Sequence, residues 1–109
     1  MKIFNTIQRC LLLSKRIAKR RRTIDRRMLK FGEEVGEFYA ASLIYDGGKG
    51  SRLGKAGKRR HLLEEGCDVL IVLLSILFLH GFKISEISKM MNEKMDKWER
   101  RLDKGVSRL

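Results

Sequence analysis

Residues 64–79 of the chain read EEGCDVLIVLLSILFL, and this stretch joins a pair of acidic residues to the most apolar run in the sequence. Glu65 and Asp68 lie three residues apart, so a helix would place both carboxylates on one face. The apolar run 69–79 has only 11 residues, whereas a membrane span needs about 20. The stretch therefore predicts a core helix with carboxylates at its edge, surrounded by other helices or by a partner subunit.

A second acidic stretch, EEVGE at residues 33–37, repeats the same spacing with Glu34 and Glu37. If the two helices pack side by side, both pairs can point at one spot. Apposed carboxylates repel one another unless they are protonated or joined by a cation, and Mg²⁺ takes oxygen ligands of this kind. One such pair alone is typical of a solvated helix face, but two pairs on successive helices favour a metal site.

The rest of the sequence predicts an all-α fold, a helical bundle of about four helices completed by oligomerisation. The chain has 109 residues and no proline, 43% of its residues are apolar, and no segment alternates as a strand does. The expected helices are 3–22, 24–45, 59–79 and 85–102. They form one domain, 1–109, with a basic N-terminal helix at 1–22, a motif-bearing core at 23–102 and a tail at 103–109. Residues 46–58 are rich in glycine and predict a loop.

Periodicity also assigns helix faces and ends. The core side of the second helix is expected to carry Met28, Phe31, Val35, Phe38 and Ser42. A separate charged stripe on that helix carries Lys30, Glu34, Glu37 and Ala41. Thr23 and Ser85 are expected to cap the second and fourth helices, and His80 and Gly81 to end the third. The two cysteines form no disulfide framework, which indicates a reducing cytoplasm, and Cys67 is expected to be a buried thiol.

The net charge of +12 is large for this length and predicts attraction to nucleotides, nucleic acid or another acidic partner. Even so, six of the 13 acidic residues lie in the two short stretches, which suits a metal site in a field that draws phosphates. The basic run 15–22 is interpreted as a solvated helix end, and a phosphate or nucleic-acid patch is the alternative.

In order and spacing, EEVGE at 33–37 followed by EGCD at 65–68 resembles the MazG-like family of all-α nucleoside triphosphate pyrophosphohydrolases. Lys30 lies one turn before Glu34, as a family lysine often does. Residues 92–101, NEKMDKWERR, are similar to a stretch on the family's last helix. The resemblance covers roughly residues 23–102. It implies hydrolysis of (d)NTPs between the α and β phosphates, which gives a monophosphate and pyrophosphate.

The resemblance also implies roles for individual residues. The ligands of Mg²⁺, for which Mn²⁺ is a possible substitute, would be Glu34, Glu37, Glu65 and Asp68. Glu33 and Glu37 are the catalytic candidates, which would orient or deprotonate a water molecule. The candidates for binding the substrate are Lys30, His61, Lys94 and Lys97. For each of these four, an ordinary helix residue without a ligand is the alternative.

Two rival functions stay open at this point. One is a related all-α pyrophosphohydrolase that acts on phosphoribosyl-ATP or on one specific dNTP. The other is a basic helical nucleic-acid-binding protein without catalysis, whose basic N-terminal helix contacts the phosphates. The expected protein is cytoplasmic and makes no use of a membrane. Because a single hairpin leaves its active-site face uncovered, we expect a homodimer or homotetramer.

Overall fold

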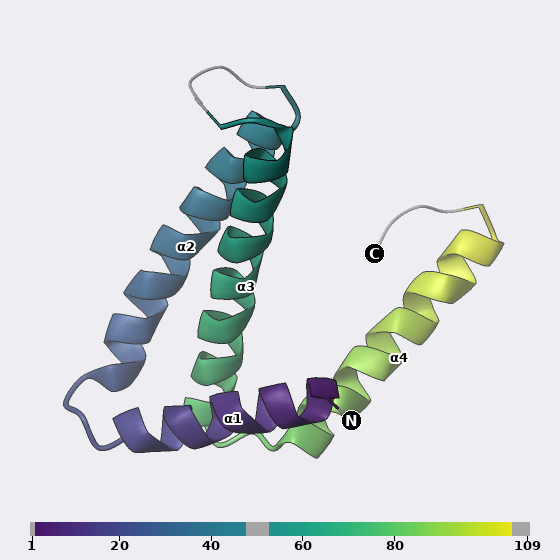
Figure 1. Cartoon of the computed structure of the whole chain (residues 1–109). Helices are drawn as coiled ribbons and strands as arrows, with labels where there is room; N and C mark the ends of the chain where they lie inside the picture. The colour runs from purple at the N-terminus through teal and green to yellow at the C-terminus, as the bar shows by residue number, and fades with distance from the viewer. Residues whose placement is uncertain (1, 48–52, 106–109) are drawn as a thin grey trace.

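The computed structural model describes residues 2–47 and 53–105, and these residues form four α-helices and no strand. The helices are α1 (Lys2–Ile17), α2 (Thr23–Tyr45), α3 (Lys55–Leu79) and α4 (Ile84–Asp103) (Figure 1). The predicted all-α fold of about four helices is therefore confirmed. Residues 48–52 of the expected loop and 106–109 of the expected tail lie outside the described residues.

The central unit is the antiparallel hairpin of α2 and α3, which have the most extensive contacts of any helix pair (Figure 1). Two contacts fix its register. The Nε of Arg27 donates to the Oγ of Ser75 at 3.0 Å, and a Cβ atom on Gly66 would lie 3.3 Å from the ring of Phe38. Glu34 is seven residues after Arg27, and Asp68 is seven residues before Ser75. Because the helices are antiparallel, this register puts Glu34 level with Asp68.

Helix α1 packs across the end of α3, whereas α4 projects away from the hairpin and has sparse contacts with the other helices (Figure 1). Ser14 of α1 and Ser75 of α3 are buried at the crossing. Each hydroxyl donates to a carbonyl of its own helix at 2.7 Å, that of Cys10 and that of Val72 respectively. These small side chains let the helices approach without leaving a buried hydroxyl unpaired.

The core side predicted for α2 is wrong in part, because Phe38 does pack against Gly66 of α3 and Phe31 and Ser42 are half-buried. Met28 and Val35 are 51% and 40% exposed, whereas Glu34 and Ala41 of the charged stripe are buried. The reason is that α3 covers only one side of α2, and the register turns Glu34 and Ala41 toward it. On α3 the buried residues are Val72, Ser75, Ile76 and Phe78, while Leu70, Ile71 and Leu73 remain exposed. The apolar run is thus covered by α1 and α2 on one side only.

Several helix ends also differ from the prediction. The first helix ends at Ile17 rather than at residue 22, because a run of like charges disfavours a further helical turn. Arg22 is left-handed, with φ of 56°, and Thr23 is the first helical residue rather than a cap. Its hydroxyl donates to the carbonyl of Ile17 at 2.9 Å. The third helix begins at Lys55, four residues earlier than expected.

At the start of α4, Ser85 lies inside the helix, and Lys83 occupies the cap position instead. The backbone N–H of Lys83 donates to the carboxylate of Glu86 at 3.1 Å, which satisfies one of the free donors at the helix start. The predicted cap at Ser85 is therefore wrong, because the helix already begins at Ile84, one residue before it.

Cys67 is exposed rather than buried, on the same side of α3 as the exposed Leu63 and Leu70. Both cysteines are free thiols. None of the described helices combines the length and the apolar content that crossing a membrane requires.

The predicted end of α3 at His80 and Gly81 is confirmed, and it has the geometry of a Schellman motif. The N–H of Gly81 donates to the carbonyl of Phe78 at 2.9 Å, and that of Phe82 to the carbonyl of Leu77 at 3.2 Å. Gly81 has φ of +88°, a conformation that other L-residues adopt with strain.

We predict that Gly81→Ala lowers the free energy of unfolding by roughly 1–2 kcal/mol, the cost of left-handed backbone for an L-residue. Gly32→Ala is the matched control, because Gly32 lies within α2 and a Cβ there would meet nothing within 4 Å. This control should raise the same free energy by about 0.5–1 kcal/mol. Urea unfolding measures both, and a shift of both variants in the same direction would contradict the assignment.

Candidate metal centre

Three glutamates from the two helices of the hairpin converge at the middle of the α2–α3 interface. Glu34 and Glu37 come from successive turns of α2, and Glu65 comes from the facing turn of α3. One carboxylate oxygen from each lies within 4.8 Å of the other two. We refer to these three residues as the glutamate group. Helical spacing within α2 and the antiparallel register together produce the convergence.

Burial distinguishes the three members. The side chain of Glu34 is only 5% exposed and that of Glu65 is 16% exposed, whereas Glu37 lies at the surface. The Oε2 atoms of Glu34 and Glu65 are buried and have no hydrogen-bond partner. A buried carboxylate oxygen without a partner is costly. A bound cation would satisfy both oxygens, so the donors that are present fit a hard divalent ion such as Mg²⁺.

The charge around the glutamate group is only partly balanced. The Nζ of Lys30 lies 2.8 Å from Oε1 of Glu34 and 3.6 Å from Oε1 of Glu33. The hydrogen bond to Glu34, followed by the charge of Glu33, raises the pKa of Lys30 and keeps the amine charged. The charge of Glu34, then desolvation, then the charge of Glu65 raise the pKa of Glu37. One lysine does not offset three carboxylates and Glu33, so the site retains an excess of negative charge.

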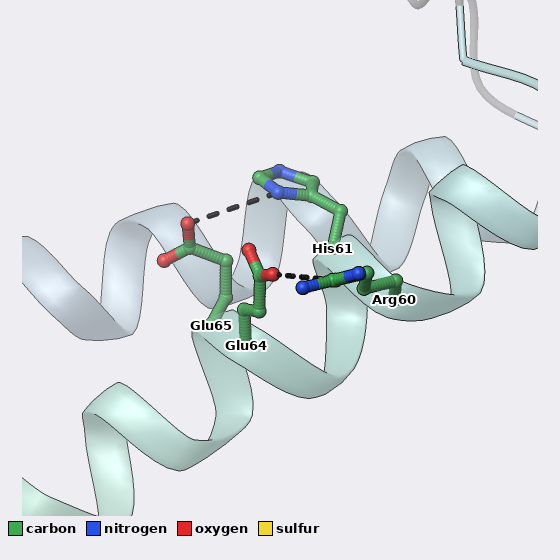
Figure 2. Close-up of polar contacts among 4 residues, drawn as sticks. All are labelled: Arg60, His61, Glu64 and Glu65. Atoms are coloured by element: carbon green, nitrogen blue, oxygen red, sulfur yellow. Dashed lines mark hydrogen bonds and ion pairs between the residues drawn. The ribbon is translucent and has the colours of Figure 1, made fainter.

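The adjacent acids Glu64 and Glu65 of α3 point in different directions (Figure 2). Glu64 turns to the surface and accepts a hydrogen bond from Arg60 Nε at 3.0 Å. Glu65 turns toward α2, with Nδ1 of His61 at 3.9 Å from its Oε1. The structure thus places Glu64 outside the glutamate group and His61 beside it, and a substrate contact by His61 stays a prediction.

The other predicted site residues lie outside the glutamate group. Asp68 is exposed, although the register puts it level with Glu34 on the neighbouring helix. Glu33 lies next to the group and contacts Lys30. Lys94 and Lys97 belong to α4, which projects away from the hairpin (Figure 1). The metal role of Asp68, the catalytic role of Glu33 and the substrate roles of the two lysines stay predictions.

Sequence reasoning missed Arg27, which lies one turn before Lys30 on the face of α2 that carries the glutamate group. Its Nε donates to Ser75 of α3 at 3.0 Å. The sequence could have indicated Arg27 by its spacing, because it lies three residues before Lys30, which lies four residues before Glu34. Arg27 was concealed among the many basic residues of the preceding run.

Comparisons of the chain with protein-family models, with curated proteins and with solved structures give no match.

We predict that Mg²⁺ stabilises the wild-type protein, because an ion bound only by the folded state shifts the unfolding equilibrium. At roughly ten times its Kd the ion should add about 1.4 kcal/mol. Thermal unfolding with a chelator and with increasing Mg²⁺ measures the effect. The metal assignment is wrong if the unfolding temperature of the wild type stays the same in EDTA and at every tested excess of Mg²⁺ over EDTA.

Glu37→Gln should have opposite effects on thermal stability with and without the ion. Without metal it should raise the unfolding temperature at neutral pH, because it removes one of three repelling carboxylates. The raised pKa of Glu37 means that this gain disappears as pH falls and the wild-type residue becomes protonated. With Mg²⁺, the variant should lose most of the metal-dependent rise. Glu64→Gln is the control, and it should respond to Mg²⁺ as the wild type does.

Proposed function

We propose that this protein is a Mg²⁺-dependent nucleotide pyrophosphohydrolase that cleaves the α–β phosphate linkage of nucleoside triphosphates. The observation that carries the proposal is the glutamate group, with two buried carboxylate oxygens that lack partners. Three carboxylates gathered in a chain with a net charge of +12 suit a cation site that receives a polyanionic substrate. The resemblance of the two acidic motifs to the MazG-like family supplies the reaction.

The residues of the chain would divide the work as follows. Glu34, Glu37 and Glu65 would hold the ion, with Asp68 joining from the level of Glu34. Bound Mg²⁺ supplies neutralisation of phosphate charge and a lower pKa for a coordinated water. Glu33, which lies beside the group, would orient or deprotonate the attacking water. The amine of Lys30, kept charged by its neighbours, would offset negative charge on the leaving pyrophosphate.

A release assay with a panel of nucleotides and Mg²⁺ tests the proposal, with pyrophosphate and monophosphate measured separately. We expect Mg²⁺-dependent release from the wild type, with Mn²⁺ as a weaker or equal substitute. Glu65→Gln should reduce kcat/KM by about 100-fold or more, as loss of a group that stabilises the transition state does. Glu64→Gln, one residue away and on the surface, should stay within about twofold, because exposed ion pairs contribute little.

Other outcomes identify the alternatives. Release restricted to phosphoribosyl-ATP or to one dNTP would assign the narrower enzyme. If no nucleotide releases pyrophosphate, and the protein binds DNA or RNA with a steep dependence on salt, the non-catalytic binder replaces the enzyme.

We also propose that a second copy of the chain covers the exposed apolar surface, giving a homodimer or homotetramer. Helix α4 supports this assignment. Its apolar side contributes Ile87, Met91, Met95 and Trp98 to an open groove, and Met91 and Trp98 are 55% and 41% exposed. The helix carries five acidic and five basic residues, so it is neutral in a strongly basic chain. Two copies can therefore approach through α4 with the least repulsion between them.

Sedimentation velocity tests the assembly. The wild type should sediment as a dimer or tetramer, and Met91→Asp should shift it toward the monomer by placing a charge on the apolar side of α4. Asn92→Asp introduces the same charge on the next residue, which lies off that side, and should leave the assembly unchanged. A monomeric wild type at tens of micromolar would contradict the proposal.

A further inference from the structure

A mostly apolar cavity that also contains two arginines lies where α1 meets the hairpin, and its Arg27 is one turn of α2 from Lys30, on the side away from Glu34. It has a volume of about 380 Å³. Residues from three helices line it, among them Arg9, Cys10, Ser14, Arg27, Ile71 and Ser75. We refer to it as the arginine cavity. Its polar groups are two guanidinium groups, hydroxyl groups and a thiol, set among apolar side chains such as Leu13 and Ile17. The glutamate group, by contrast, consists of carboxylates.

The two arginines lack the acidic partners that buried or clustered guanidinium groups usually have. Ser75 fixes Arg27 by accepting its Nε–H, and the Ser75 hydroxyl is itself fixed because it donates to the carbonyl of Val72. Within the described ranges, neither Arg9 nor Arg27 lies within ion-pair distance of a carboxylate. The terminal N–H groups of Arg27 thus remain available for a ligand. Two positive charges at one cavity repel each other unless an anion joins them.

The arginine cavity lies on the same face of the hairpin as the glutamate group. On α2, Arg27, Lys30 and Glu34 follow one another at intervals of three and four residues. On α3, Asp68, Ile71 and Ser75 do the same, so each set shares one helix face. The seven residues from Arg27 to Glu34 correspond to a rise of about 10 Å along α2. A polyphosphate chain bound near Glu34 and the long side chain of Arg27 together span a distance of that size.

Arginine is the side chain best suited to phosphate oxygens, because its planar fork donates two parallel hydrogen bonds. Along α2 the side chains change from carboxylates at Glu37 and Glu34, through the amine of Lys30, to the guanidinium of Arg27. This order matches a phosphate chain that starts at a metal ion and ends at an arginine. We propose that the arginine cavity binds a pyrophosphate-class anion through Arg9 and Arg27. That this anion is the distal, leaving end of a nucleotide rests on the proposed function.

Helix α1 therefore takes part in binding through Arg9 and shapes the cavity through Cys10 and Ser14. The basic run that follows α1, by contrast, lies outside the lining of the cavity. Cys10 is also useful as a probe. Its thiol contacts the carbonyl of Ile71 across the cavity wall, and burial raises the pKa of Cys10 while the charge of Arg27 lowers it. An anion bound at the arginines would cover this thiol.

Alkylation of Cys10 by iodoacetamide, followed by peptide mass spectrometry, tests the proposal without any catalysis. The reaction is run in EDTA with and without pyrophosphate, so the glutamate group takes no part. Cys67 is exposed and lies outside the arginine cavity, so its rate is the internal reference. At about ten times its Kd, pyrophosphate should slow the alkylation of Cys10 relative to Cys67 about tenfold. A nucleoside monophosphate, which lacks the distal phosphates, should protect less.

Variants assign the protection to the two arginines. Arg9→Gln and Arg27→Gln should each abolish most of it, whereas Arg20→Gln, which removes a basic residue outside the cavity, should retain it. Each variant is compared with itself with and without pyrophosphate, because Arg27 also affects the thiol directly. Arg9 is exposed, so its variant should fold even if loss of the contact between Arg27 and Ser75 destabilises the other. Circular dichroism checks both.

The outcomes separate this inference from the proposed function. Failure of pyrophosphate to protect Cys10, or protection that survives in both variants, would overturn the arginine cavity even if the wild type hydrolyses nucleotides. Protection by a short DNA or RNA oligonucleotide but not by pyrophosphate would also overturn it. Protection that depends on the arginines supports the cavity, and it does so even where no nucleotide is cleaved and the proposed function fails.

Discussion

The burial of the Glu34 carboxylate between α2 and α3 is the constraint on which the rest of the structure depends. A charged group at this depth loses its hydration, and one hydrogen bond from Lys30 replaces only part of it. The same packing that excludes water from Glu34 brings Glu65 and Glu37 to it. A hairpin stabilised by apolar contacts alone would place a leucine here, so the interface gives up stability at this point. Such a local loss of stability is typical of a functional site, and a bound divalent cation would restore the lost stability.

Opposite charges are separated along a single face of the hairpin. The glutamate group collects negative charge, and about two turns away the arginine cavity collects positive charge that no described carboxylate neutralises. Lys30 lies between them and is paired with the acidic side. Neither arrangement is favourable in isolation, because like charges held together repel. A magnesium–polyphosphate complex would relieve both at once, since its cation suits the carboxylates and its phosphates suit the arginines.

A single chain leaves many of its large apolar side chains exposed. The side of α2 that carries Met28 and Val35, the outer side of α3 with Leu70 and the groove along α4 all face solvent. Large contiguous apolar patches are rare on the surfaces of monomeric proteins. Assembly with a second copy would cover them, and it could also bring Lys94 and Lys97 of one chain to the glutamate group of another. The position of α4 away from its own hairpin is compatible with such an exchange (Figure 1).

The sequence by itself determined the four helices and the end of α3 at Gly81. It also predicted Glu34, Glu37, Glu65 and Asp68 as converging acids, and the first three of these meet. These features depend on local spacing, capping and periodicity, which neighbouring residues specify. Only the tertiary structure decided which face of α2 meets α3, because α2 has an apolar stripe and a charged stripe and periodicity favoured the apolar one. It also decided that Asp68 faces solvent, that Cys67 is exposed and that Arg27 reaches Ser75 across 48 positions of sequence. Such contacts are set by helix register and by side-chain packing between distant segments, and the spacing of residues within one helix carries no information about either.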